Sequence, residues 1–307
     1  MGLPVSRRSL LAAAAGLDAV RGAPVRPMRL GGPVFVKSED PAVLARAHRA
    51  LGYRAAYAPA VELTDSARIR AIRDAFAAQD VCIAEVGAWV NMLAPDPAER
   101  RKNLDYVESL LALAEELGAR CSVDIAGSYN PDLWYGPDPR NLSREFIDAT
   151  VGNARRLIDA VKPRRTVFCI EMSPWNFPSS PDEYVRLVRA VDRKGFGVHV
   201  DICNLINSPY RMYGNTEVIR EVYRKLGRWI VSNHVKDIKW VPGMALHFEE
   251  TVPGRGKMDY RTWLEELSRL PVDAPLMQEH LKGEREYEEG RRPFQEAARS
   301  AGLSFGV

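Results

Sequence analysis

The sequence predicts an α/β protein with one domain, a closed (βα)8 barrel that spans residues 26–307. Short apolar runs alternate with long helical patterns that carry charges on one face, and eight such pairs follow one another along the chain. This alternation indicates a parallel sheet, and eight units are what a closed barrel needs. No linker or change of composition marks a second domain, and no G-x-G-x-x-G turn of a dinucleotide-binding fold follows the first apolar run.

Each strand–helix pair can be placed by its residues. The expected strands are 29–36, 53–61, 81–89, 121–129, 166–175, 196–207, 230–239 and 275–281. The helices that follow them are expected at 40–52, 65–80, 96–119, 143–162, 180–195, 215–229, 258–270 and 284–302. Several helices should begin at a capping side chain and end near a glycine. The expected caps are Asp65, Ser143, Ser180 and Asn215, and the expected final glycines are Gly52, Gly118, Gly195 and Gly302.

The composition is that of an ordinary globular protein. Of the 307 residues, 46% are hydrophobic and 27% are charged, and the net charge of +3 has no local concentration that would favour a nucleic-acid partner. Beyond residue 25, no stretch approaches the roughly 18 apolar residues of a membrane span. The four cysteines form no C-x-x-C pair, so we expect reduced, buried thiols rather than a disulfide framework or a zinc knuckle.

Residues 1–25 are set apart from the expected barrel. They contain a twin arginine, Arg7 and Arg8, followed by a short apolar stretch at 9–17, and so resemble a Tat export signal. Asp18 interrupts this stretch and no A-x-A cleavage site follows, so a disordered or helical N-terminal extension is an equal alternative. Two locations therefore remain open: the cytoplasm and, after export, the periplasm or the exterior of the cell.

The predicted site lies at the carboxyl ends of the barrel strands, where the active sites of such barrels are built. Four consecutive expected strands end there in a carboxylate or an imidazole: Glu171, Asp201, His234 and Glu279. Side chains alternate along a strand, so these four can point inward at the same depth. Three converging carboxylates would repel one another unless a cation lies between them. An oxygen-rich donor set with one nitrogen suits Mn²⁺ or Mg²⁺.

The alternation of side chains along each strand also predicts which way the neighbours of these four residues point. His199 and Lys236 share the inward face, so they should contact substrate oxygens or orient the ligands. Asp237 has the opposite parity and is expected to anchor a loop. His280 follows the glutamate of the last strand and is expected to face away from the site.

Further candidates for the pocket wall follow other strand ends. Trp89, Asn91 and Trp175 are placed to line the pocket, where a tryptophan can lie against the face of a sugar or simply pack at the barrel rim. Glu85, within the third expected strand, is a weaker candidate for a substrate contact.

With these residues in place, the chain resembles the xylose isomerase-like TIM barrels, in particular the group of sugar phosphate isomerases and epimerases. The resemblance runs from residue 30 to the end, and its most specific pieces are IEMSPWN (170–176), VHVDICN (198–204), NHVKD (233–237), VPGRGKMDY (252–260) and MQEH (277–280). It implies one divalent metal ion, Mn²⁺ before Mg²⁺ or Co²⁺, bound by Glu171, Asp201, His234 and Glu279. It further implies that Glu171 and Glu279 form the acid/base pair and that Arg255 contacts the substrate or closes the site.

The chain departs from the ketose epimerases of this group in three places. Asn204 stands where they carry a histidine, three residues after the aspartate ligand. Trp175, Asn176 and Phe177 replace their Asn-Arg pair. The stretch 240–253 is long and is expected to form a loop that reshapes the pocket. Contacts to sugar hydroxyls, including that expected of Asn204, should therefore differ from those of an enzyme for a simple free ketose.

The residues and the resemblance together predict an isomerase or epimerase of carbohydrate metabolism that moves a proton next to a carbonyl through a metal-stabilised cis-enediolate. The alternative is a metal-dependent lyase or dehydratase that eliminates a β-substituent from a keto-sugar, keto-glycoside or inosose at the same site. A barrel that only binds sugar would not need two apposed glutamates.

An apurinic-site endonuclease is a remote alternative, because those enzymes hold three zinc ions with many histidines and this chain has five histidines in all. The expected partner is a small sugar or keto-sugar, with no nucleic acid and no membrane. The resemblance adds that barrels of this group often form homo-oligomers.

Overall fold

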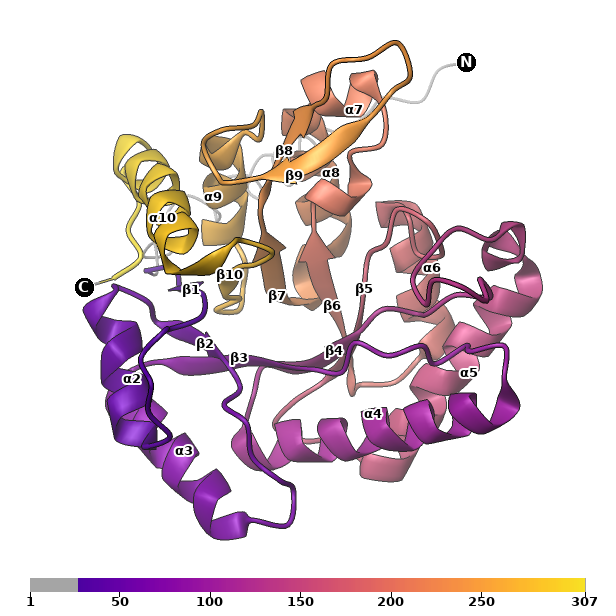
Figure 1. The fold of residues 1–307 in the computed structure, drawn as a ribbon, viewed down its shortest axis with the longest axis horizontal. Coiled ribbons are helices and arrows are strands. Elements are labelled where there is room, and N and C mark those ends of the chain that lie inside the picture. Colours follow the sequence, from indigo (N-terminus) through magenta and orange to yellow (C-terminus); the bar gives the residue numbers. More distant parts are fainter. Residues whose placement is uncertain (1–26, 307) are drawn as a thin grey trace, which may run out of the picture.

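An eight-stranded parallel barrel forms the centre of the protein, as predicted (Figure 1). The computed structural model describes residues 27–306, so the twin-arginine hypothesis for residues 1–25 lies outside the described part of the chain. Around the barrel the strands follow the order β1-β10-β7-β6-β5-β4-β3-β2. The barrel closes where Leu30 pairs with Leu276, so the first and last strands are neighbours.

The barrel strands are β1 (Leu30–Gly31), β2 (Ala55–Tyr57), β3 (Cys82–Gly87), β4 (Cys121–Asp124), β5 (Phe168–Glu171), β6 (Phe196–Asp201), β7 (Ile230–Val235) and β10 (Leu276–Gln278). The helices around it are α2 (Pro41–Ala50), α3 (Ser66–Ala78), α4 (Pro97–Leu117), α5 (Arg144–Val161), α6 (Pro181–Val191), α7 (Pro209–Tyr213), α8 (Asn215–Leu226), α9 (Tyr260–Ser268) and α10 (Gly283–Ser300). Short 3₁₀ turns are η1 (Pro139–Leu142), η2 (Cys203–Leu205) and η3 (Gly227–Trp229). No helix within residues 27–306 is long and apolar enough to cross a membrane.

The helix boundaries follow local chemistry, with two corrections. The side chains of Asp65, Ser143 and Ser180 accept hydrogen bonds from the first turns of α3, α5 and α6, as predicted. Asn215 is not a cap: it lies inside α8, and its amide donates to Lys257 O at 2.9 Å. Gly195 does not end α6 either, because Asp192 takes the left-handed conformation there (φ 48°).

The main apolar core fills the space between the barrel and the helices. Of the three smaller clusters, one consists of Ala55, Ala84 and Met277 and one of Cys121, Val123 and Cys169. Met277 and Cys169 stand two residues before Glu279 and Glu171, so they face the barrel interior beneath these carboxylates. Cys121, Cys169 and Cys203 are buried and unpaired, as expected, whereas Cys82 is partly exposed. The apolar side chains of Met277 and Cys169 therefore lie deeper in the barrel than the two carboxylates.

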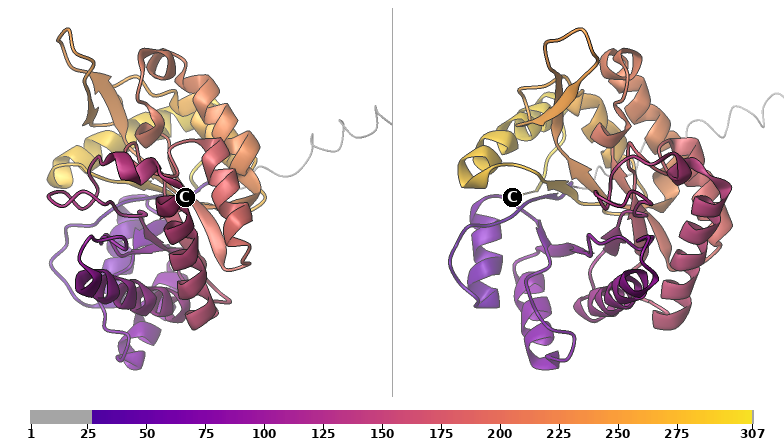
Figure 2. Two further views of the ribbon diagram at one scale, coloured as in Figure 1. Left: turned by 90° about the vertical axis from the view of Figure 1, so that its right-hand side faces the viewer. Right: turned by 45° about the vertical axis from the view of Figure 1, so that its right-hand side comes forward.

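The strand expected at 230–239 is two strands, and the expected loop at 240–253 is largely a hairpin. β7 ends at Val235, and after Lys236 the chain enters β8 (Asp237–Trp240), which pairs antiparallel with β9 (Phe248–Thr251). Figure 2 shows this hairpin standing out from the end of the barrel. A short-range pattern does not reveal this pairing, because the hairpin's two strands enclose a seven-residue turn, 241–247.

Asp237 joins the start of the hairpin to the segment that follows it. Its Oδ2 accepts hydrogen bonds from the amides of Gly254 (3.0 Å) and Gly256 (2.8 Å), and its Oδ1 accepts from those of Ile238 (2.9 Å) and Met258 (3.1 Å). The chain passes so close that a Cβ on Gly256 would lie 2.1 Å from Asp237 Oδ1. The expectation that Asp237 anchors a loop is met.

We expect Asp237→Ala to lower the free energy of unfolding by about 2–4 kcal/mol, because it leaves several enclosed amide donors without an acceptor. Chemical denaturation followed by circular dichroism measures this. The matched control is Glu249→Ala on the same hairpin, which removes only an exposed ion pair with Lys239 and should change the midpoint little. Equal midpoints for the two variants would contradict the anchoring role.

Candidate metal centre and substrate cavity

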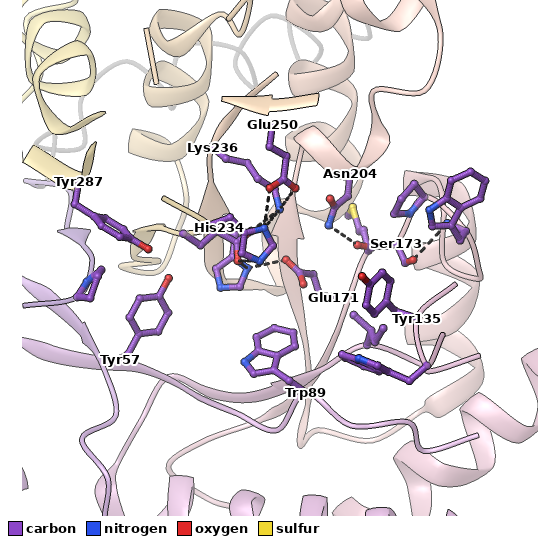
Figure 3. A pocket seen from close by; sticks show the side chains of 18 residues that line it. Tyr57, Trp89, Tyr135, Glu171, Ser173, Asn204, His234, Lys236, Glu250 and Tyr287 are labelled. Atoms are coloured by element: carbon purple, nitrogen blue, oxygen red, sulfur yellow. Dashed lines mark hydrogen bonds and ion pairs between the residues drawn. The ribbon is translucent and has the colours of Figure 1, made fainter. Parts of the chain in front are cut away.

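Four neighbouring strands bring the predicted metal-binding side chains together at the carboxyl end of the barrel. Asp201 pairs in register with His234, and His234 with Met277, two residues before Glu279. One donor atom from each of the four side chains lies within 4.8 Å of those of the other three; these are Glu171, Asp201, His234 and Glu279. Figure 3 shows Glu171 and His234 side by side at the bottom of a cavity. This buried group could bind a metal ion.

The ring of His234 faces carboxylates on both sides. Its Nδ1 lies 2.7 Å from Glu171 Oε1 and 2.9 Å from Glu279 Oε2, and its Nε2 lies 2.8 Å from Glu85 Oε1. Burial alone would lower the pKa of His234, but the three carboxylates outweigh it and raise that pKa well above the ordinary value. When Nε2–H donates to Glu85, the lone pair of Nδ1 is free for a cation. A carboxylate behind a ligating histidine is the usual support of a metal site.

The two carboxylate oxygens of Asp201 have different partners. Its Oδ1 accepts from the amides of Cys203 (2.9 Å) and Asn204 (3.3 Å), which fixes the side chain. Its Oδ2 is buried and forms an ion pair with the Lys236 ammonium, 2.8 Å away. Burial raises the pKa of Asp201 to about 7 against the opposing charge of Lys236. A fixed oxygen of this kind, beside two glutamates and an imidazole, fits a hard divalent cation.

Lys236 lies inside the site, as parity predicted. Its Nζ is 2.6 Å from Glu279 Oε1, 2.8 Å from Asp201 Oδ2 and 2.9 Å from Glu250 Oε1. Burial alone would lower the pKa of Lys236, but these carboxylates hold that pKa well above its ordinary value. A permanently charged ammonium therefore faces the cavity and balances part of the negative charge around it.

Among the charged and titratable residues at the cavity, sequence reasoning missed Glu250 and placed His280 wrongly. Glu250 reaches in from β9, with Oε1 on Lys236 and Oε2 2.8 Å from His280 Nδ1. His280 was expected to face away, but its backbone is left-handed (φ 57°), which breaks strand parity and turns the ring toward the cavity. The signal for Glu250 would have been a hairpin prediction over 237–251, whose inner face carries this residue.

His199 and Glu85 lie beneath the cavity and do not line it. Of the two roles expected of His199, orientation of the ligands fits this position and contact with the substrate does not, and the contact expected of Glu85 is not found. Glu85 bridges the two imidazoles, with Oε2 3.0 Å from His199 Nε2 and Oε1 on His234. Ala56 pairs with Ile83, but the next residue, Tyr57, pairs with Glu85, so one residue of β3 is skipped in the pairing. This bulge shifts the alternation of side chains and turns Glu85 inward. Burial alone would raise the pKa of Glu85, but the two imidazoles outweigh it and lower that pKa to about 2.

A cavity of about 750 Å³ opens above the centre. Of the predicted pocket residues, Trp89, Trp175, Asn204 and Lys236 line it. Sequence reasoning did not include the rest of its aromatic wall: Tyr57, Trp134, Tyr135 and Tyr287. The ring of Trp89 lies close to that of His234, with centroids 5.8 Å apart. Trp89 and Tyr57 thus flank the imidazole (Figure 3).

Asn91 and Arg255 do not line the cavity. Asn91 is buried, donates to Ser128 O at 2.8 Å and accepts from the amide of Ser128 at 2.9 Å, so it positions the loop after β4. Arg255 is exposed and pairs with Glu289 of α10, with Nη2 2.6 Å from Oε2. In the VPGRG segment the amides of the two glycines donate hydrogen bonds to Asp237. Its arginine does not line the cavity.

Comparison with known proteins identifies the fold. The sequence profile described as xylose isomerase-like TIM barrel matches residues 44–297, and a search of curated protein sequences finds no match. The structure is similar to D-psicose 3-epimerase with D-tagatose from Clostridium cellulolyticum (TM-score 0.63, 15% identity, 91% of this chain and 100% of that one). It is also similar to the probable 3-DHS dehydratase AsbF from Bacillus anthracis (0.63, 11%, 87% and 97%). Endonuclease IV from Thermus thermophilus has the same fold (0.66, 18%, 89% and 100%).

Loss of a residue that only supports a metal ligand weakens binding about 10–100-fold. We expect Asp201→Asn, which changes a candidate ligand itself, to weaken divalent-cation binding by more than this. The substitution is isosteric and keeps an acceptor for the amides of Cys203 and Asn204, but it puts an NH₂ group where Oδ2 of the carboxylate lies. Isothermal titration of metal-depleted protein with Mn²⁺ measures the change. Glu249→Gln, which alters an exposed carboxylate on the nearby hairpin, is the control and should bind Mn²⁺ nearly as the wild type does. Unchanged binding by Asp201→Asn would exclude this centre.

A second substitution tests the support behind His234. Glu85→Gln puts an amide NH₂ or a weaker acceptor against the two imidazoles, so Mn²⁺ affinity should fall about 10–100-fold in the same titration. Ser232→Ala removes only the 3.3 Å hydrogen bond that the hydroxyl donates to Glu85 Oε2 and serves as its control. Equal affinities of Glu85→Gln and the wild type would show that Glu85 does not orient the ligand.

Proposed function

The chain belongs to the xylose isomerase-like TIM barrel family, and from this premise and the site's geometry we propose that it is a divalent-metal-dependent isomerase or epimerase of a keto-sugar. One observation carries the proposal: Glu171 and Glu279 both line the cavity, and both approach the same nitrogen of His234 within 2.9 Å. Two carboxylates are thus aimed at one small volume in front of a potential cation site.

This pair suits proton transfer next to a carbonyl. Such a proton is weakly acidic, so its removal needs a placed base and stabilisation of the enediolate that forms. Glu171 and Glu279 can take the proton and return one, and general catalysis of this type contributes typically about 10²–10⁴-fold. Return to the opposite face of the same carbon inverts it, whereas return to the neighbouring carbon isomerises the sugar.

The residues that would hold the metal ion are Glu171, Asp201, His234 and Glu279. A bound divalent cation supplies Lewis-acid stabilisation of negative charge on the substrate's oxygens, worth several kcal/mol. Three carboxylates and one imidazole suit Mn²⁺ first, with Mg²⁺ or Co²⁺ as alternatives.

Other side chains orient the substrate and the ligands. The Lys236 ammonium faces the cavity and can donate to a substrate oxygen. Asn204 donates to Met172 O at 3.0 Å, which holds its amide at the cavity wall. Glu85 holds His234 from behind, so the ligating nitrogen keeps its direction.

A lyase or dehydratase acting on a keto-sugar is the second candidate, favoured by the contact between Glu250 and His280 at the cavity. Elimination of a β-substituent from the enediolate needs a further group near the leaving oxygen, beyond the two glutamates. An endonuclease activity has less support, since among the described residues the buried centre contains two histidines, His199 and His234.

We expect Glu171→Gln and Glu279→Gln each to reduce turnover to background, because an amide cannot accept the substrate proton. The measurement is NMR of keto-sugars and keto-glycosides in deuterated buffer with Mn²⁺. Exchange with an intact skeleton indicates isomerisation or epimerisation, and loss of water or of an aglycone indicates elimination. Glu249→Gln on the hairpin is the control and should keep full activity. If both site variants retained near-native exchange, the assignment of the acid/base pair would fail.

A further inference from the structure

One end of the cavity is aromatic and lies away from the charged centre. Figure 3 places Tyr135 and Ser173 on one side of Glu171, and Tyr57 and Tyr287 on the far side of His234. The cavity's volume of about 750 Å³ lies in the upper part of the range of about 300–1,000 Å³ that is usual for small-molecule sites. The acid/base pair occupies only part of this space.

Three aromatic side chains form this end. Trp134 and Tyr135 follow β4, and their rings meet edge to face, with centroids 5.3 Å apart at 89°. Trp175 follows β5. Tyr135 is 45% exposed and Trp175 54% exposed, and both line the cavity. Exposed aromatic surface gathered at a concave site marks a place where a ligand binds.

The loop that carries Trp134 and Tyr135 is held by enclosed polar side chains. Ser128 and Asn141 are fully buried, and both donate to the carbonyl of Gly136, at 2.7 and 3.0 Å. Asn141 also accepts from the amide of Tyr129 at 2.9 Å. These hydrogen bonds therefore hold the backbone on both sides of the two aromatic residues.

The loop of Trp175 is tied to the same structure. Asn176, next in the chain, is buried, and its amide donates to Gly127 O at 2.7 Å. Gly127 immediately precedes Ser128, so the two aromatic loops are joined through one hydrogen bond between their buried parts. A subsite that is preformed in this way loses little entropy when it binds a rigid ring.

The chemistry of the lining favours an uncharged ring. Among the described residues that line the cavity, none is an arginine, and the lysine, Lys236, is already surrounded by carboxylates. Figure 3 shows two neutral polar residues, Ser173 and Asn204, on the same side of Glu171 as Tyr135. A phosphate there would lack the basic partners that such groups need.

We propose that the substrate is an uncharged keto-glycoside with two rings. The keto-sugar ring reaches Glu171 and Glu279, and the second ring lies against Trp134, Tyr135 and Trp175. This inference rests on the proposed function, since it assumes that the reacting carbonyl lies at the acid/base pair.

Binding of inert glycosides tests the subsite without requiring turnover. We expect phenyl glucoside to bind the Mn²⁺-loaded protein about 10-fold more tightly than glucose does, as measured by isothermal titration. Trp175→Ala and Tyr135→Ala should each lose much of this preference and leave glucose binding nearly unchanged. Both side chains are largely exposed, so folding should survive. Tyr210→Ala, which removes a 91% exposed tyrosine of α7 outside the cavity, is the control and should keep the preference.

Turnover separates the failure of this inference from that of the proposed function. We expect kcat/KM for a phenyl keto-glucoside to exceed that for the free keto-glucose, and Trp175→Ala to remove the difference mainly through KM. Proton exchange on the free keto-sugar with no preference for two rings would overturn the inference and leave the proposed function standing. A two-ring preference in binding with no reaction on any keto-sugar would overturn the proposed function. Tightest binding of a glucose phosphate would also overturn the inference.

Discussion

The contact between Glu85 and His234 determines how the rest of the site can work. Glu85 is enclosed in the barrel 2.8 Å from His234 Nε2, which leaves Nδ1 to face Glu171 and Glu279. Without that carboxylate the ring could take the other tautomer, and its ligating lone pair would point away from the four-residue group. The same carboxylate also meets His199, so one residue of β3 orients imidazoles from two neighbouring strands. The centre depends on a side chain that does not line the cavity.

The turn from β7 into the hairpin connects this centre to the outer loops. Lys236 and Asp237 are adjacent, and they point in different directions. Lys236 enters the site, where Glu250 returns from β9 to meet it. Asp237 holds the segment after the hairpin through the amides of Gly254 and Gly256. Because one turn fixes both contacts, the position of the hairpin and the charge balance of the site are set together.

The alternation of side chains was sufficient to predict the four candidate ligands, because they lie at or just beyond the ends of regular parallel strands: Glu171, Asp201, His234 and Glu279. It failed where the backbone leaves regular geometry. A left-handed residue turned His280 toward the cavity. Glu85, a candidate for a substrate contact, faces inward at a bulge in β3 but meets His199 and His234 beneath the cavity. Glu250 depends on the pairing of β8 with β9, which is a long-range contact. Arg255 was assigned from a motif, and its position follows instead from an ion pair with Glu289.

The residues of the site lie on two different parts of the fold. The groups suited to proton transfer lie at strand ends, where the closed barrel fixes them and leaves little freedom to vary. The aromatic groups lie on the loops after β4 and β5, which Ser128, Asn141 and Asn176 hold from below. Loops pinned by buried side chains can change their exposed residues without disturbing the barrel. The reaction type should therefore follow from the strand ends, and the choice of substrate from Trp134, Tyr135 and Trp175.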